Sequence, residues 1–122
     1  MIILALAVAA FQWRRGATPG GNDPYAALPF RPAVAFDSQS VTVSNTEDEP
    51  YLETRLNLYV GVIVYSVPVG LLRPGEAATR SLGDFKNEQG ESFDPATHKA
   101  ILLEVRARFG GYDSHKDFSP PR

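Results

Sequence analysis

The chain has 122 residues, of which 43% are hydrophobic and 21% are charged, and it contains no cysteine. This length fits one domain with appendages, and the lack of cysteine excludes a disulfide scaffold, a zinc–thiolate site and a cysteine nucleophile. The formal net charge of −2 disfavours a nucleic-acid-binding protein, because the neutralisation of phosphates requires a surplus of basic residues.

The chain begins with an apolar segment whose only polar side chain before Trp13 is Gln12, and Arg14 and Arg15 follow. A Trp next to two Arg is typical of the cytoplasmic end of a transmembrane helix. Fifteen helical residues span about 22 Å, which is less than the ~30 Å hydrocarbon core of a bilayer. The sequence predicts a short membrane-anchor helix over residues 1–15, with Trp13, Arg14 and Arg15 at the interface. A helix that starts further upstream and the remnant of a signal peptide are the alternatives.

Basic residues after an apolar segment place the following domain on the cytoplasmic side of a membrane. We therefore expect a cytoplasmic domain anchored in a bacterial inner membrane. Basic residues upstream of a different start would reverse this orientation, so a periplasmic location is the alternative.

Residues 16–32 contain three glycines and four prolines, which no helix or central strand tolerates. We expect an extended connector. Tyr25, Leu28 and Phe30 interrupt it with large apolar side chains, for which a freely solvated spacer has no use. These three residues are therefore predicted to lie along a surface, either that of the same chain or that of a partner.

Residues 33–109 alternate between apolar and polar side chains with a period of two, most clearly over 41–44, 52–60 and 101–109. Turn signals separate these runs at 45–50, 73–76, 87–90 and 94–95. Short strands with turns between them predict an all-β domain, an antiparallel sandwich or barrel of six or seven strands. Residues 110–122 are predicted to form a polar tail.

Residues 56–72 form an uncharged stretch that is apolar on both faces of a strand. A second membrane span is conceivable, but many β-branched residues favour either a hairpin broken near Gly61 or one bent strand. One set of side chains would fill the core. The opposite set would need cover from the chain itself or from a partner, and we assign to it the partner-binding candidates Tyr59, Ile63, Tyr65 and Val67.

The order of the 41–44 strand, an acidic turn, the 52–60 strand, the Arg-Pro-Gly-Glu turn at 73–76 and the 101–109 strand resembles a known family. It is similar to the immunoglobulin- or fibronectin-type β-sandwich domains of bacterial envelope and membrane proteins. The resemblance implies an antiparallel immunoglobulin-like β-sandwich and no particular chemistry.

No base–nucleophile pair and no nucleotide-binding motif is present, so we expect no enzyme and no cofactor. His115 with Asp113 and Asp117 has the composition of a metal site, but a polar tail would not fix its geometry. The carboxylates of 47–49 favour a solvated turn over a calcium site, and His98 is expected to hydrogen-bond a turn carbonyl. No metal site is predicted.

These features favour a non-catalytic, membrane-anchored accessory or scaffold subunit. Its sandwich and connector would bind and stabilise a larger membrane protein complex, for example an energy-transducing one. The anchor would contact the lipid bilayer, and we expect no nucleic-acid partner. The alternative is a membrane-tethered sensory module that binds a small ligand or metal through the loops around 47–49 and 85–93.

Overall fold

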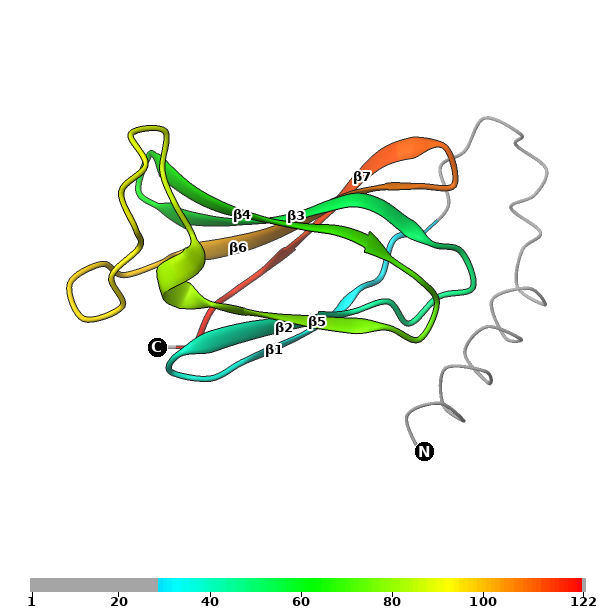
Figure 1. The fold of residues 1–122 in the computed structure, drawn as a ribbon, viewed down its shortest axis with the longest axis horizontal. Helices are drawn as coiled ribbons and strands as arrows, with labels where there is room; N and C mark the ends of the chain where they lie inside the picture. The colour runs from blue at the N-terminus through cyan, green and yellow to red at the C-terminus, as the bar shows by residue number, and fades with distance from the viewer. Residues whose placement is uncertain (1–28, 122) are drawn as a thin grey trace.

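The computed structural model describes residues 29–121, which form two antiparallel β-sheets packed against each other (Figure 1). The three-stranded sheet has the order β1 (Ala33–Phe36), β2 (Ser40–Ser44) and β5 (Ala77–Ser81). The four-stranded sheet has the order β4 (Ile63–Leu72), β3 (Tyr51–Val60), β6 (Leu102–Phe109) and β7 (Tyr112–Phe118). A short 3₁₀ helix, η2 (Leu82–Asp84), follows β5. The prediction of an all-β sandwich is confirmed.

The core lies between the two sheets, where alternate residues of β2, β3, β4 and β6 point inward. Val41 and Val43 of β2 are fully buried, and so are Leu103 and Val105 of β6. This period-two burial follows directly from the pleat of a strand, which turns successive side chains to opposite faces. The apolar alternation in the sequence therefore marks the inner faces of both sheets.

The uncharged stretch 56–72 lies in the β3–β4 hairpin. Of the two predicted alternatives, the structure shows the hairpin broken near Gly61 and not one bent strand. Val60 pairs with Ile63, so the turn consists of Gly61 and Val62 alone. Gly61 has φ +60°, which a two-residue hairpin turn of this kind requires at its first position and which glycine adopts at little cost. A two-residue turn pairs odd-numbered with even-numbered residues, so Tyr59 shares a face with Val64 and not with Ile63 or Tyr65.

Residues 110–122, which the sequence analysis takes as a polar tail, contain the edge strand β7. Gly110 and Gly111 both have positive φ angles and turn the chain back on itself. Phe109 then pairs with Tyr112, and the pairing continues to Leu103 with Phe118. The predicted tail is thus the fourth strand of the larger sheet.

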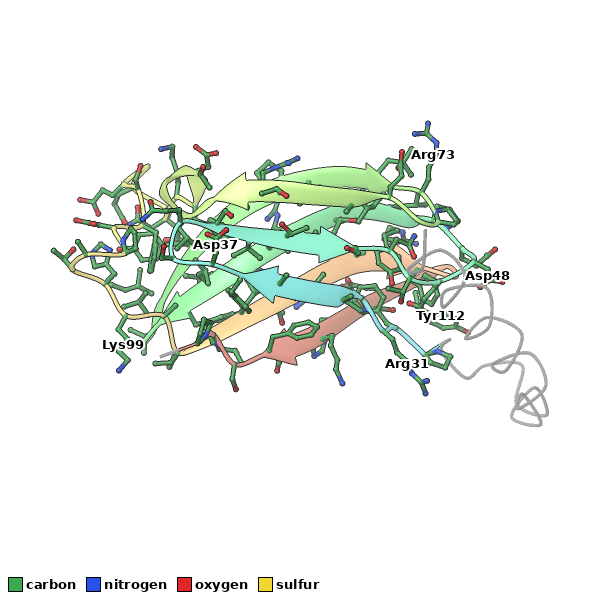
Figure 2. All side chains as sticks on the ribbon, turned by 90° about the horizontal axis from the view of Figure 1, so that it is seen from below. Arg31, Asp37, Asp48, Arg73, Lys99 and Tyr112 are labelled. Atoms are coloured by element: carbon green, nitrogen blue, oxygen red, sulfur yellow. The ribbon has the colours of Figure 1, made fainter. Side chains whose placement is uncertain are left out.

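The sandwich has two distinct ends. The proximal end, where the described chain begins, carries the turns at 45–50, 73–76 and 110–111. The distal end carries the turns at 37–39 and 61–62, the loop 82–101 and the last described residues. Figure 2 shows Arg31, Asp48, Arg73 and Tyr112 at the proximal end and Asp37 and Lys99 at the distal end.

Candidate functional site

The last residues of the predicted connector are fastened to the proximal end. The Phe30 side chain is 9% exposed, and its ring lies 4.9 Å from that of Tyr51 and 5.7 Å from that of Phe109, centre to centre. Tyr51 and Phe109 also meet edge to face at 5.4 Å. The sequence leaves two surfaces open for Phe30, that of its own domain and that of a partner. In the structure, Phe30 packs on its own domain.

Glu47 anchors the backbone of the same segment. Its Oε2 accepts a hydrogen bond of 2.9 Å from the Arg31 amide and one of 2.7 Å from the Tyr51 hydroxyl. Thr46 Oγ1 donates to the Arg31 carbonyl at 2.9 Å. Glu47 is only 8% exposed, so the expectation of a solvated turn is wrong for this residue. The chain therefore reaches the sandwich along a fixed path at 30–32.

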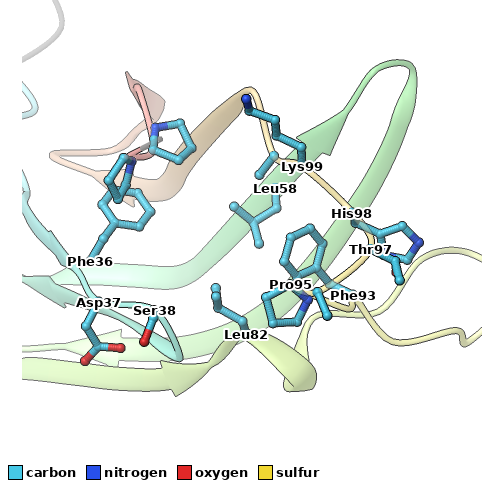
Figure 3. A pocket seen from close by; sticks show the side chains of 14 residues that line it. Phe36, Asp37, Ser38, Leu58, Leu82, Phe93, Pro95, Thr97, His98 and Lys99 are labelled. Atoms are coloured by element: carbon cyan, nitrogen blue, oxygen red, sulfur yellow. The ribbon is translucent and has the colours of Figure 1, made fainter.

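A cavity of about 620 Å³ opens at the distal end (Figure 3). The cavity is lined by side chains from the β1–β2 turn, from β3, from the loop 82–101 and from the last described residues. Apolar groups predominate: Phe36, Leu58, Leu82, Phe93 and Pro95 line it. A mostly apolar concavity of this size is typical of sites that bind small molecules or protruding side chains.

His98 supports the loop beside this cavity. Its Nδ1 accepts a hydrogen bond of 2.9 Å from the Asp94 amide, and its own amide donates to the Asp94 carbonyl at 2.7 Å. The imidazole ring lies 5.3 Å from Tyr65 and 5.6 Å from Phe93. The sequence predicts a hydrogen bond from His98 to a turn carbonyl. In the structure, the ring instead accepts a hydrogen bond from the Asp94 amide. An accepting Nδ1 places the proton of a neutral imidazole on Nε2.

Three large apolar side chains are exposed at the distal end. Val62 in the hairpin turn is 97% exposed, Ile63 is 47% exposed and Ile101 is 61% exposed. Ile101 is held beside β3 by its amide, which donates to the Tyr59 carbonyl at 2.8 Å. We call Val62, Ile63 and Ile101 the distal apolar cluster.

The partner-binding candidates of the β3–β4 hairpin separate into three environments. Tyr65 and Val67 are 4% and 6% exposed, so the chain itself covers them and they belong to the core. Ile63 lies past the edge of the core in the distal apolar cluster. Tyr59 lies half-buried on the outer face of the four-stranded sheet. For Tyr65 this cover includes the loop 82–101, whose Phe93 and His98 rings lie 5.6 and 5.3 Å from the Tyr65 ring.

The outer face of the four-stranded sheet carries a polar network centred on Glu104, which is 8% exposed. Asn57 Nδ2 donates to Glu104 Oε1 at 2.9 Å, and Ser66 Oγ donates to Asn57 Oδ1 at 2.6 Å. Arg106 contacts Glu104 Oε2 at 3.3 Å and Asp113 Oδ2 at 3.1 Å. This network is not predictable from the sequence, because the cross-strand register that brings Asn57 opposite Glu104 is not visible there.

Two side chains in this network have shifted pKa values. Partial burial raises the pKa of the Tyr59 hydroxyl, and the nearby Glu104 carboxylate raises it further. The hydrogen bond to Asp113 raises the pKa of the Arg106 guanidinium, with a further contribution from Glu104. Both shifts favour the protonated forms, so the network has a neutral Tyr59 and a charged Arg106.

The remaining predicted site residues, Trp13, Arg14, Arg15, Tyr25 and Leu28, lie outside the described residues. Within 29–121, no helix has the length and apolar character needed to cross a membrane. Comparison of the chain with protein families, with curated proteins and with solved structures found no match.

Proposed function

We propose that the protein is a non-catalytic, membrane-tethered β-sandwich that binds a larger membrane protein complex as an accessory subunit. The tether is the predicted anchor over 1–15, with the domain on the cytoplasmic side of a bacterial inner membrane. The observation that carries the proposal is the distal apolar cluster, because single exposed apolar residues are normal but a group beside a cavity is a frequent contact site.

The arrangement of the two ends supports this proposal. Phe30 and Glu47 fasten the end of the connector at the proximal end, so the described chain enters the domain at the end opposite the distal apolar cluster. A tether attached there would hold the domain near the membrane and leave the distal apolar cluster accessible to a neighbouring subunit.

Charge around the distal end indicates what kind of partner surface fits. The loop 82–101 carries four carboxylates and two lysines: Asp84, Glu88, Glu91 and Asp94 against Lys86 and Lys99. A complementary partner would insert apolar side chains at the cavity and place basic side chains around them. We therefore infer a protein segment with an apolar centre and a basic rim.

The relation to immunoglobulin- and fibronectin-type domains is part of the proposal. Seven antiparallel strands in sheets of three and four agree with it. The constant-type immunoglobulin order places the fourth strand in the sheet of the first two strands, whereas β4 here pairs with β3. We thus favour the variants in which the fourth strand belongs to the opposite sheet.

The test is native electrophoresis of the full chain, extracted from its own membranes with a mild detergent. We expect the unmodified chain to migrate with a stoichiometric large membrane protein, and Val62→Asp with Ile63→Asp to migrate alone. Leu71→Asp is the matched control, because Leu71 is 45% exposed but lies near the proximal end of β4. Migration of the unmodified chain alone, or an undiminished complex in the double variant, would contradict the proposal.

The distal cavity favours a second candidate, a tethered module that binds a small apolar molecule. Its volume of about 620 Å³ falls within the usual range for such sites. In that case the purified chain would be a monomer whose melting temperature rises with the ligand. Substitution of Leu82, which lines the cavity, by Trp would remove the rise.

A further inference from the structure

We propose that Glu104, His115 and Asp117, on the outer face of β6 and β7, bind a divalent transition-metal ion of the zinc type. Their ligand atoms all lie within 4.8 Å of one another. This inference goes beyond the proposed function and does not depend on the membrane tether or on the distal end.

The strand geometry brings the three side chains to one place. Glu104 and Asp117 are direct partners across β6 and β7, so they share a face of the sheet. His115 lies two residues before Asp117 on β7 and therefore points to the same side. The objection that His115 belongs to a tail without fixed geometry does not hold, because β7 is paired along its whole length.

Two carboxylates directly opposite each other on one face repel, and Glu104 and Asp117 form such a pair across β6 and β7. Arg106 contacts Glu104 at 3.3 Å and Asp113 at 3.1 Å, and Asp113 also lies opposite Arg108. A divalent ion bound between Glu104 and Asp117 would relieve the repulsion of that pair.

Glu104 is oriented before any ion binds. Asn57 donates to its Oε1 at 2.9 Å and Tyr59 is within 3.5 Å of the same oxygen, while the residue is 8% exposed. Hydrogen bonds of this kind orient metal-ligating carboxylates and increase affinity. His115 and Asp117 are exposed, so their side chains can close the small remaining distance by rotamer changes, since tetrahedral ligands around zinc lie about 3.4 Å apart.

The ligand types select the ion. One imidazole and two carboxylates suit zinc and the neighbouring divalent transition metals, whereas calcium and magnesium favour sites built from oxygen alone. Three protein ligands leave a fourth tetrahedral position for water. We therefore expect zinc and cobalt to bind and magnesium not to compete.

The experiment is a calorimetric titration of the metal-free full chain with Zn²⁺, repeated in excess Mg²⁺. We expect saturable one-to-one binding at micromolar or lower concentration, and binding at least about tenfold weaker in His115→Ala and in Asp117→Asn. His98→Ala is the matched control, because the only other histidine lies at the distal end of the sandwich.

A second measurement requires no variant. In the nuclear magnetic resonance spectrum of the unmodified chain, Zn²⁺ should shift the ring signals of His115 and leave those of His98 in place. The absence of saturable binding up to millimolar Zn²⁺, equal affinity of His115→Ala and His98→Ala, or a shift of His98 alone would each overturn the proposal.

Discussion

Asp37 closes the turn between β1 and β2 with its own carboxylate. Its Oδ1 accepts hydrogen bonds of 2.7 Å from the amides of Gln39 and Ser40, and its Oδ2 accepts one of 3.0 Å from the Ser40 hydroxyl. These donors, that of Gln39 foremost, hold the pKa of Asp37 below its ordinary value of 3.8. Such turns, in which an Asp side chain binds amides two and three residues on, stabilise a short chain reversal.

The lowered pKa of Asp37 gives a pH-dependent prediction. A carboxyl group with a lower pKa in the folded state adds stability above its unfolded value, and this contribution is lost as the pH falls through the folded value. We expect the unmodified chain to exceed Asp37→Asn in free energy of unfolding above pH 3.8, and the difference to shrink below it. Urea titrations of both proteins from neutral to acidic pH measure this difference.

Ser40→Ala is the companion variant for that prediction. It removes the Ser40 hydroxyl, one of the three donors to Asp37, and keeps both amides, so the pH-dependent difference should become smaller but should not vanish. A difference between the unmodified chain and Asp37→Asn that stays constant at all pH values would show that the hydrogen bonds do not favour the charged form.

Glu47 shows why single residues of the proximal end escape prediction. In the sequence it is one of three successive carboxylates, a composition typical of a solvated turn. In the structure its partners are the Arg31 amide, from a segment that the sequence marks as a connector, and the Tyr51 hydroxyl. A contact between two turns depends on how the sheets pack, which the local sequence does not contain.

At the scale of elements, β3 shows where a regular alternation fails. The pairing of β3 with β4 shifts register between Tyr51 and Arg55, and its pairing with β6 shifts between Leu52 and Arg55. Glu53 in this segment has a φ of +52°. This bulge inserts an extra residue, so Leu52 is 44% exposed although the alternation places it on the inner side, and Tyr51 is fully buried. From Leu56 onward the strand is regular, and the inner residues Leu56 and Leu58 are buried as the alternation predicts. Asn57 on the outer face is also buried, at 7% exposed, where it hydrogen-bonds Glu104.

The bulge predicts an unusual effect of glycine within a strand. A side chain at positive φ costs about 1 kcal/mol, a cost that glycine avoids. We expect Glu53→Gly to exceed Glu53→Ala by roughly 1 kcal/mol in the free energy of unfolding, measured with urea. The comparison with alanine isolates the backbone, because both variants lose the carboxylate. A less stable glycine variant would mean that this residue does not adopt the left-handed conformation.

The β7 strand is hard to predict from the sequence for a different reason. Its sequence, from Tyr112 to Phe118, is polar and charged, as befits an edge strand whose outer side meets water. The available signal was Gly110 with Gly111, a dipeptide that frequently forms two-residue hairpin turns directly after a strand. Without the pairing of β7 with β6, the sequence gives no geometry for Glu104, His115 and Asp117.

At the scale of the whole molecule, the described chain enters the sandwich at its proximal end, and the cavity lies at its distal end. The described chain starts beside the proximal turns and ends at the distal end (Figure 1). Its last residues, Pro120 and Pro121, line the cavity there. That cavity joins segments as distant as Phe36 and Pro120, so composition and periodicity do not reveal it. The sequence predicted the fold class from local pattern, whereas the candidate sites depend on long-range packing.

The proposed anchor over residues 1–15 gives a prediction about membrane orientation. If Arg14 and Arg15 hold the anchor with the domain on the cytoplasmic side, Arg14→Glu with Arg15→Glu should remove the signal that sets this orientation. In inside-out vesicles, protease should digest the domain of the unmodified chain, whereas in the double variant the domain should be protected or absent from the membrane fraction.

Arg14→Lys with Arg15→Lys preserves the charge and should behave as the unmodified chain. Identical fractionation and digestion of the Glu and Lys variants would mean that these arginines do not orient an anchor, and the tether would then have to be abandoned as the basis of the proposed function.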